Sequence, residues 1–182
     1  MVQPNTVYDG VRVAKFDDFE VCNGSDIGCS LYLQGCPHHC KDCFNPETWD
    51  MDGGQPFSDG LFNQIGQTLQ HSYIRRFTLL GGEPCIMRNK AVLQSLCQFI
   101  KQCYHGTSIW LYSGYTYEEL IQRGWKSVLQ YIDVLVDGRF EVENKNLAIP
   151  FRGSTNQRII DVQQSLNTNQ VVLKKEFYHD TK

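Results

Sequence analysis

Short apolar runs alternate along the chain with longer segments in which apolar side chains recur every three or four residues. Runs of the first kind are typical of buried strands, and segments of the second kind are typical of amphipathic helices. The predicted strands cover residues 29–34, 74–80, 108–112 and 132–136. The predicted helices cover residues 58–71, with Leu61, Ile65 and Leu69 on one face, and residues 89–104. Strands and helices therefore alternate from residue 29 onward.

Polar residues at the predicted helix starts support these boundaries. Ser58 and Asn89 each stand where an N-cap is expected, because Ser and Asn side chains accept hydrogen bonds from the first free amides of a helix. Thr116 and Glu119 have the spacing of a capping box, which predicts a short helix after residue 116.

This alternation predicts an α/β fold with a mostly parallel sheet and crossover helices. A complete eight-fold βα barrel needs about 250 residues, and this chain has 182. We therefore expect an open, partial barrel, built as a single domain over residues 1–182. Residues 1–22 and 157–177 read as partly extended and are expected to add strands.

Each predicted strand is followed by residues suited to a binding site. A cysteine-rich loop follows the first strand, and the other three are followed by Gly81-Gly82-Glu83, Ser113-Gly114 and Asp137-Gly138. In parallel α/β folds, ligands bind at the carboxyl ends of the strands. We therefore expect these four segments to converge on one site.

Composition narrows the class of protein. The formal net charge is −3, which argues against a nucleic-acid partner held by bulk electrostatics. No apolar stretch is long enough to predict a membrane span, and residues 1–10 show no secretory signal. The eight cysteines then favour metal ligation over disulfides, because intracellular thiols are kept reduced. The expected location is the cytoplasm.

Three cysteines lie on one short loop, at the spacing C-x3-C-x2-C. Cys36, Cys40 and Cys43 can surround an iron–sulfur cluster, since thiolates are its usual ligands. Three ligands leave one iron of a four-iron cluster open to a substrate. A structural zinc site with His38 or His39 as fourth ligand is the alternative, although no second CxxC-like unit is present. Both histidines are otherwise expected to face solvent.

The remaining cysteines carry less information. Cys29, Cys97 and Cys103 lie in apolar patterns and are expected to pack in the core. Cys22 and Cys85 have no CxxC-type partner, so no second cluster is predicted.

The cysteine spacing followed by the aromatic Phe44 resembles the signature of the radical S-adenosylmethionine superfamily, and Gly81-Gly82-Glu83-Pro84 resembles its methionine-binding motif. A closer resemblance is to the activating enzymes of anaerobic (class III) ribonucleoside-triphosphate reductases. It covers roughly residues 8–161 and leaves residues 162–182 without a match. The segments that carry it are NPETW (45–49), GGQPF (53–57), LLGGEP (79–84), LYSGYTYEEL (111–120), DVLVDGRF (133–140) and FRGSTNQR (151–158).

The resemblance implies an oxidoreductase with a [4Fe–4S] cluster and S-adenosylmethionine as cofactors. Such enzymes cleave S-adenosylmethionine reductively to methionine and a 5′-deoxyadenosyl radical, which generates a glycyl radical on the reductase. The implied partners are that reductase and a one-electron donor such as flavodoxin. Two other functions stay open: an activase for a different glycyl-radical enzyme, and a zinc-binding interaction module without catalysis.

The resemblance also implies roles for individual residues. It places the backbone around Asp42, Cys43 and Phe44 against the adenine side of S-adenosylmethionine. The loop that Glu83 shapes would face the methionine amino group. Gly81 and Gly82 would let the backbone approach the ligand, although Gly-Gly-Glu-Pro alone also fits a simple turn.

The resemblance also implies roles for the residues that follow the third and fourth predicted strands. Ser113 would line the S-adenosylmethionine pocket. Asp137 and Arg139 resemble the Asp-x-Lys element of related activases with Arg in place of Lys, and the alternative is a turn with solvated charges. The residues Arg152, Asn156, Gln157 and Arg158 are expected to contact a ligand or partner, or else to form a salt-bridged strand edge.

Overall fold

The computed structural model describes residue 8 and residues 10–178, which contain a seven-stranded sheet in the order β3-β1-β2-β4-β5-β6-β7. The strands are β1 (Arg12–Glu20), β2 (Gly28–Leu33), β3 (Gln55–Pro56), β4 (Arg76–Gly81), β5 (Ser108–Ser113), β6 (Val134–Asp137) and β7 (Arg158–Asp161). The α-helices are α1 (Asp59–Leu69), α2 (Lys90–Cys103), α3 (Tyr117–Gln122), α4 (Lys126–Leu129) and α5 (Val162–Thr168). Single 3₁₀ turns are η1 (Pro46–Thr48), η2 (Met87–Asn89), η3 (Val142–Asn144) and η4 (Lys175–Phe177).

The centre of the sheet is parallel and its edges are antiparallel. β2, β4, β5 and β6 run in the same direction, as the alternation of strands and helices predicts. β1 and β3 add one antiparallel edge, and β7 adds the other. The predicted α/β class is confirmed. The predicted mostly parallel sheet is found only in its four central strands, and the complete sheet is mixed.

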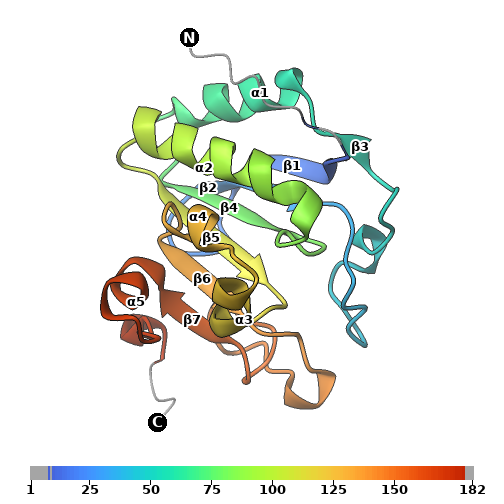
Figure 1. Ribbon diagram of the computed structural model, residues 1–182, viewed down its shortest axis with the longest axis vertical. Coiled ribbons are helices and arrows are strands. Elements are labelled where there is room, and N and C mark those ends of the chain that lie inside the picture. Colours follow the sequence, from blue (N-terminus) through green and yellow to red (C-terminus); the bar gives the residue numbers. More distant parts are fainter. Residues whose placement is uncertain (1–7, 9, 179–182) are drawn as a thin grey trace.

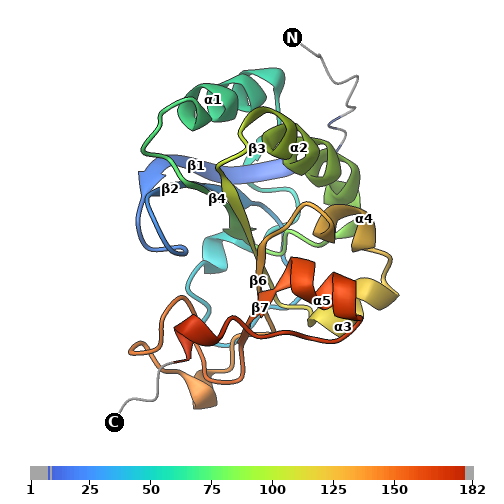
Figure 2. The ribbon, with the colours of Figure 1, turned by 90° about the vertical axis from the view of Figure 1, so that its left-hand side faces the viewer.

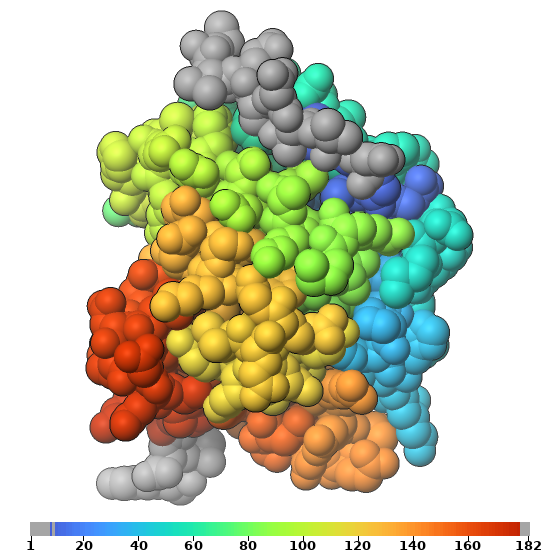
Figure 3. Space-filling model, viewed as in Figure 1, coloured from blue at the N-terminus to red at the C-terminus, as the bar shows by residue number. Residues whose placement is uncertain are grey.

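The helices cover one face of the sheet. Figure 1 shows α1 and α2 across the face formed by β1, β2 and β4, and Figure 2 shows α3, α4 and α5 together beside β6 and β7. Apolar side chains of the strands and of these helices form one buried cluster between the two layers. Figure 3 shows the side chains of α2, α3 and α4 meeting over this face.

The opposite face has a smaller core. Trp110, Val134 and Ile159 are buried there, and Phe151 and Phe177 pack against Trp110 with ring centroids 5.3 and 5.6 Å from its own. Burial of this aromatic surface is a large favourable contribution to folding. These contacts hold the segment around Phe177 against β5.

Two of the three predicted helix caps are confirmed. The Ser58 hydroxyl accepts from the amide of Leu61 at 3.2 Å, and Thr116 and Glu119 form the capping box. The predicted cap at Asn89 is wrong, because its side chain makes no capping bond and donates instead to the Pro84 carbonyl at 3.1 Å. A tertiary partner has replaced the local one.

The two terminal segments that were expected to add strands, residues 1–22 and 157–177, are only partly extended where the structure describes them. β1 lies within residues 1–22, of which residues 1–7 and 9 are outside the described part. Within 157–177, β7 is a strand, but residues 162–168 form α5, capped by the Asp161 side chain.

The non-cluster cysteines divide between core and surface. Cys29 and Cys97 are buried as predicted, and Cys85 is buried as well. Cys103 is exposed, which corrects its predicted place on a packed face: it is the last residue of α2, where Ile100 takes the core position. Within the described ranges, no helix has the length and apolar character needed to cross a membrane.

Candidate cofactor site

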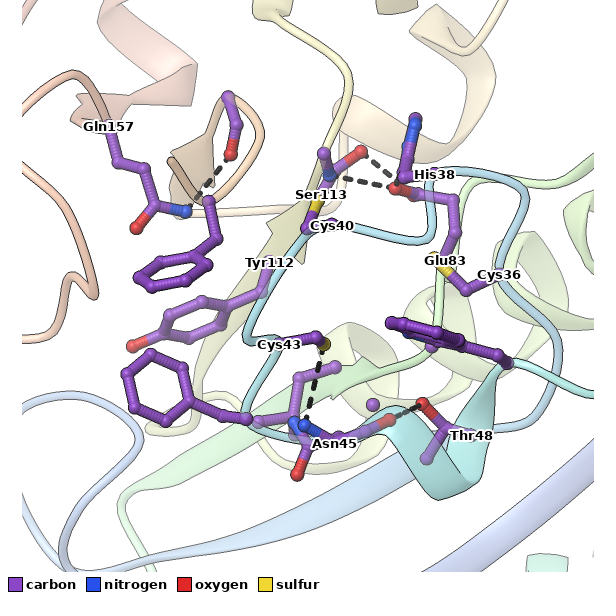
Figure 4. Close-up of a pocket in the computed structure, with 18 residues that line it drawn as sticks. Cys36, His38, Cys40, Cys43, Asn45, Thr48, Glu83, Tyr112, Ser113 and Gln157 are labelled. Carbon is purple, nitrogen blue, oxygen red and sulfur yellow. Dashed lines mark hydrogen bonds and ion pairs between the residues drawn. The ribbon is translucent and has the colours of Figure 1, made fainter. Parts of the chain in front are cut away.

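A pocket opens at the carboxyl ends of β2, β4, β5 and β6 (Figure 4). It brings together segments from all four predicted strand ends, as expected for a parallel sheet. Its lining consists of Cys36, His38, Cys40, Cys43, Phe44, Asn45, Thr48, Trp49, Leu80, Gly81, Gly82, Glu83, Tyr112, Ser113, Gly114, Gly138, Phe140 and Gln157.

The cysteine loop is held by backbone hydrogen bonds at its base. The Gly35 amide donates to the Thr48 carbonyl at 2.8 Å, and the Cys36 amide donates to the Trp49 carbonyl at 3.2 Å. Gly35 has φ +97°, a conformation that favours glycine. The loop therefore leaves β2 sharply and returns beside its own start, with all three predicted ligands on the pocket wall.

Burial favours the protonated form of the Cys36 and Cys40 thiols, because it raises the pKa of both. Desolvation raises the pKa of Cys36 to about 11, and hydrogen bonds from the backbone of His38 and His39 offset only part of this effect. Desolvation also raises the pKa of Cys40. Because metal ligation requires thiolates, the charge of a bound metal group must displace these protons.

The donor set fits an iron–sulfur cluster better than a single zinc ion. The two candidate histidine ligands are engaged elsewhere: His38 lies 2.9 Å from Glu83, and the His39 ring stacks on Trp49. Among the described residues, no three His, Cys, Asp or Glu side chains are grouped as a single metal ion requires. Three thiols spread around one pocket suit a group of several metal atoms.

The prediction that His38 faces solvent is wrong, because its side chain is almost fully buried. Its ring packs edge-on against Tyr115, with centroids 4.5 Å apart. His39 is exposed, as predicted.

Glu83 is a buried carboxylate with four donors around it. Oε1 accepts from the Ser113 hydroxyl and the Cys85 amide, each at 2.8 Å. Oε2 accepts from the Gly114 amide at 2.7 Å and lies 2.9 Å from His38 Nε2 (Figure 4). Glu83 therefore connects the cysteine loop with the ends of β4 and β5, and its oxygens are already occupied by the protein.

Gly81 and Gly82 allow the strand end to approach the cysteine loop. A Cβ on Gly81 would lie 2.7 Å from the Leu33 carbonyl oxygen, and one on Gly82 would lie 2.5 Å from that of Gly35. Real Cβ atoms are not found so close to backbone. In this structure the two glycines are required by contact between two protein segments.

Phe44 forms an aromatic wall beside the pocket. Its side chain is half-exposed and meets Phe140 edge-on, with centroids 5.1 Å apart. Asp42, at φ +56°, is exposed and is not among the pocket-lining residues. Cys43 receives a hydrogen bond at Sγ from the Asn45 amide, at 3.4 Å.

Asp137 lies just outside the pocket lining. Its carboxylate accepts from the Tyr117 amide at 2.7 Å and pairs with Arg158, which also pairs with Glu118. These bonds hold the start of α3 against β6 and β7. The salt-bridged strand edge, the alternative for Arg158, is the arrangement found.

The other predicted contact residues mostly support the loop between β6 and β7. Asn156 donates to the Arg139 carbonyl at 2.8 Å, and Gln157 donates to the Gly138 carbonyl at 2.9 Å. Arg152 donates to the carbonyls of Gln157 and Phe177. Of these residues only Gln157 lines the pocket.

Sequence reasoning gave no role to several lining residues, among them Asn45, Thr48, Trp49, Tyr112 and Phe140. Trp49 lies in the NPETW segment, which was singled out only as part of a resemblance. The side of the sheet on which Tyr112 lies could have been predicted from strand alternation, which places its side chain on the face opposite the buried Leu111.

Comparison with known proteins supports an iron–sulfur site. The family model described as a 4Fe-4S single cluster domain matches residues 22–160. The chain is 38% identical over 146 residues to a protein of Pasteurella multocida (strain Pm70), covering 77% of this chain and 90% of that protein. It is 36% identical over 140 residues to a protein of Escherichia coli (strain K12), covering 76% and 90%. A protein of Enterobacteria phage T4 is 35% identical over 139 residues, covering 75% and 85%. All three are named anaerobic ribonucleoside-triphosphate reductase-activating protein.

Proposed function

This chain belongs to the family of anaerobic ribonucleoside-triphosphate reductase-activating proteins, and from that premise we propose that it generates a glycyl radical on such a reductase. The reductase is its protein substrate, and a one-electron donor such as flavodoxin supplies the electron. The protein acts in the reducing cytoplasm.

One observation carries the proposal: three cysteines line the pocket without a fourth cysteine among its described lining residues. Cys36, Cys40 and Cys43 would hold a [4Fe–4S] cluster and leave one iron for S-adenosylmethionine. When bound, the two cofactors supply a 5′-deoxyadenosyl radical and methionine by reductive cleavage of the sulfonium. The protein contributes binding, orientation and exclusion of water.

The pocket lining suggests how S-adenosylmethionine is held. Phe44 and Tyr112 offer an apolar wall for adenine, next to the backbone of Cys43. The backbone of Gly81 and Gly82, with Ser113, faces the methionine end. Glu83 and Asp137 act indirectly in this proposal, because protein donors already occupy their carboxylates.

The mixed sheet is consistent with the finer assignment of the fold. We assign it to the open βα barrel of radical S-adenosylmethionine enzymes, as a single domain over residues 1–182 with the motif-bearing part at 8–161. In that arrangement the face of β4, β5 and β6 opposite the α-helices is the inner face of the barrel.

The decisive experiment mixes the anaerobically reconstituted protein with S-adenosylmethionine, a reductant and the co-encoded anaerobic reductase. The expected result is a glycyl-radical EPR doublet on the reductase. In a parallel sample a pyruvate formate-lyase-type enzyme replaces the reductase, and no glycyl-radical doublet is expected. A doublet only in that second sample would favour the rival activase. Colourless protein that retains one zinc per chain after iron and sulfide treatment would favour the interaction module.

A further inference from the structure

Trp49 has a buried hydrogen-bond donor without an acceptor. Its indole Nε1 is shielded from solvent and has no partner among the described residues. Leaving a buried donor unpaired costs about 1–3 kcal/mol, and native proteins contain few such groups. An unpaired donor beside a cofactor pocket points to an acceptor that belongs to the cofactor.

The backbone fixes Trp49 directly beside the predicted ligands. Its carbonyl accepts from the Cys36 amide at 3.2 Å, so the two residues lie opposite each other across the base of the cysteine loop. Trp49 lines the same pocket as all three cysteines. The His39 ring stacks on it, with centroids 4.9 Å apart and planes inclined by 26°. The His39 ring therefore covers one face of the indole.

The site already uses an N–H group as a donor to sulfur. The Asn45 amide donates to Cys43 Sγ at 3.4 Å. Sulfur atoms of iron–sulfur clusters accept such bonds, and these bonds are among the features that set the reduction potential. The indole of Trp49 offers one more N–H, from a side chain.

We propose that Trp49 donates its indole N–H to a sulfur atom of the cluster held by Cys36, Cys40 and Cys43, and thereby raises the cluster's reduction potential. The inference rests on the cluster assignment of the proposed function. Its physical reason is electrostatic, because a donor stabilises the reduced cluster, which carries the additional negative charge, more than the oxidised one.

The first test compares Trp49→Phe with Trp125→Phe in redox titrations of the reconstituted full-length protein, followed by EPR. Phe keeps an aromatic ring for His39 but removes the N–H. Trp125 is the matched control, since its Nε1 is also buried without a partner among the described residues, but it lies in the helix-side core and outside the pocket lining. We expect only Trp49→Phe to lower the reduction potential of the cluster. The expected shift is ~59 mV, which corresponds to a tenfold change in the equilibrium constant of a one-electron reduction. Equal potentials in all three proteins would overturn the proposal.

A second measurement can refute the proposal with the wild-type protein alone, and the two variants then assign the signal. The chain has three tryptophans, which can be labelled with ¹⁵N in the indole ring. Pulsed EPR of the reduced wild-type cluster is expected to show an indole ¹⁵N coupling, retained in Trp125→Phe and lost in Trp49→Phe. A reduced [4Fe–4S] cluster without any such coupling refutes the indole bond and leaves the proposed function intact. Failure to assemble a [4Fe–4S] cluster refutes the cluster assignment and this inference with it.

Discussion

The Nε2 atom of His38 lies 2.9 Å from Oε2 of Glu83, and both side chains are almost fully buried. This bond joins the middle of the cysteine loop to the segment that follows β4. The same carboxylate accepts from Ser113 and Gly114 at the end of β5. A single buried acceptor thus fixes three segments of the pocket relative to one another.

Glu83→Gln tests this connection. The amide keeps the shape of the side chain but can accept at only one end, so either Gly114 or Ser113 loses its acceptor in a buried site. We expect the free energy of unfolding of the metal-free protein to fall by about 1–3 kcal/mol, measured by urea denaturation. Glu176→Gln is the control, because its side chain is exposed and pairs only at the surface. Equal effects of the two substitutions would mean that the buried contacts of Glu83 do not contribute to the free energy of unfolding.

Gly82→Ala tests how closely the two loops approach each other. The added Cβ would lie 2.5 Å from the Gly35 carbonyl oxygen, so the cysteine loop must shift. We expect a loss of about 1–3 kcal/mol in unfolding free energy, together with a lower iron content after reconstitution. Gly60→Ala provides a contrast: its Cβ meets nothing closer than 3.6 Å, within α1. That change is expected to stabilise the protein by about 0.5–1 kcal/mol. An undiminished iron content in Gly82→Ala would contradict the steric argument.

Cys40→Ala tests the cluster ligands. Cys40 lies in a loop outside the helices and strands, so we expect the far-UV circular dichroism spectrum to be unchanged. Cleavage of S-adenosylmethionine, followed as release of 5′-deoxyadenosine, is expected to be lost. Cys103→Ala, at an exposed position on α2, should retain wild-type cleavage. If Cys40→Ala still cleaved S-adenosylmethionine at a matched cluster content, Cys40 would not be a ligand.

Glu118 makes stability depend on pH. Hydrogen bonds from Arg158 lower the pKa of its carboxyl group below the usual value. A carboxyl whose pKa is lower in the folded state stabilises the fold above its unfolded pKa, and this contribution disappears as the pH falls through the folded pKa. Glu118→Gln should therefore flatten the decline of the urea midpoint between about pH 5 and about pH 3. Glu143→Gln, at an exposed position, is the control and should leave the wild-type slope. Identical slopes for wild type and Glu118→Gln would exclude this contribution.

Patterns along the chain predicted the parallel centre of the sheet, because helical and extended periodicities differ within a few residues. They did not predict the direction of β1 and β7, since an extended segment looks the same whether it pairs in a parallel or an antiparallel manner. Asn89 shows the same limit at a helix end. Its type fits a cap, but the Pro84 carbonyl, brought near by the fold, takes its hydrogen bond.

The pattern along the chain was enough to place the central strands and the end of the sheet at which the site lies, because the three cysteines and the glycine-rich segment follow strands that run in the same direction. Which of those residues face the pocket depends on the packing of the folded chain. It turned His38 towards Glu83, joined Asp137 to Arg158, and left the indole N–H of Trp49 unpaired beside the cysteines. A buried polar group takes whichever partner the fold brings within hydrogen-bond distance, and most of these partners are distant in sequence.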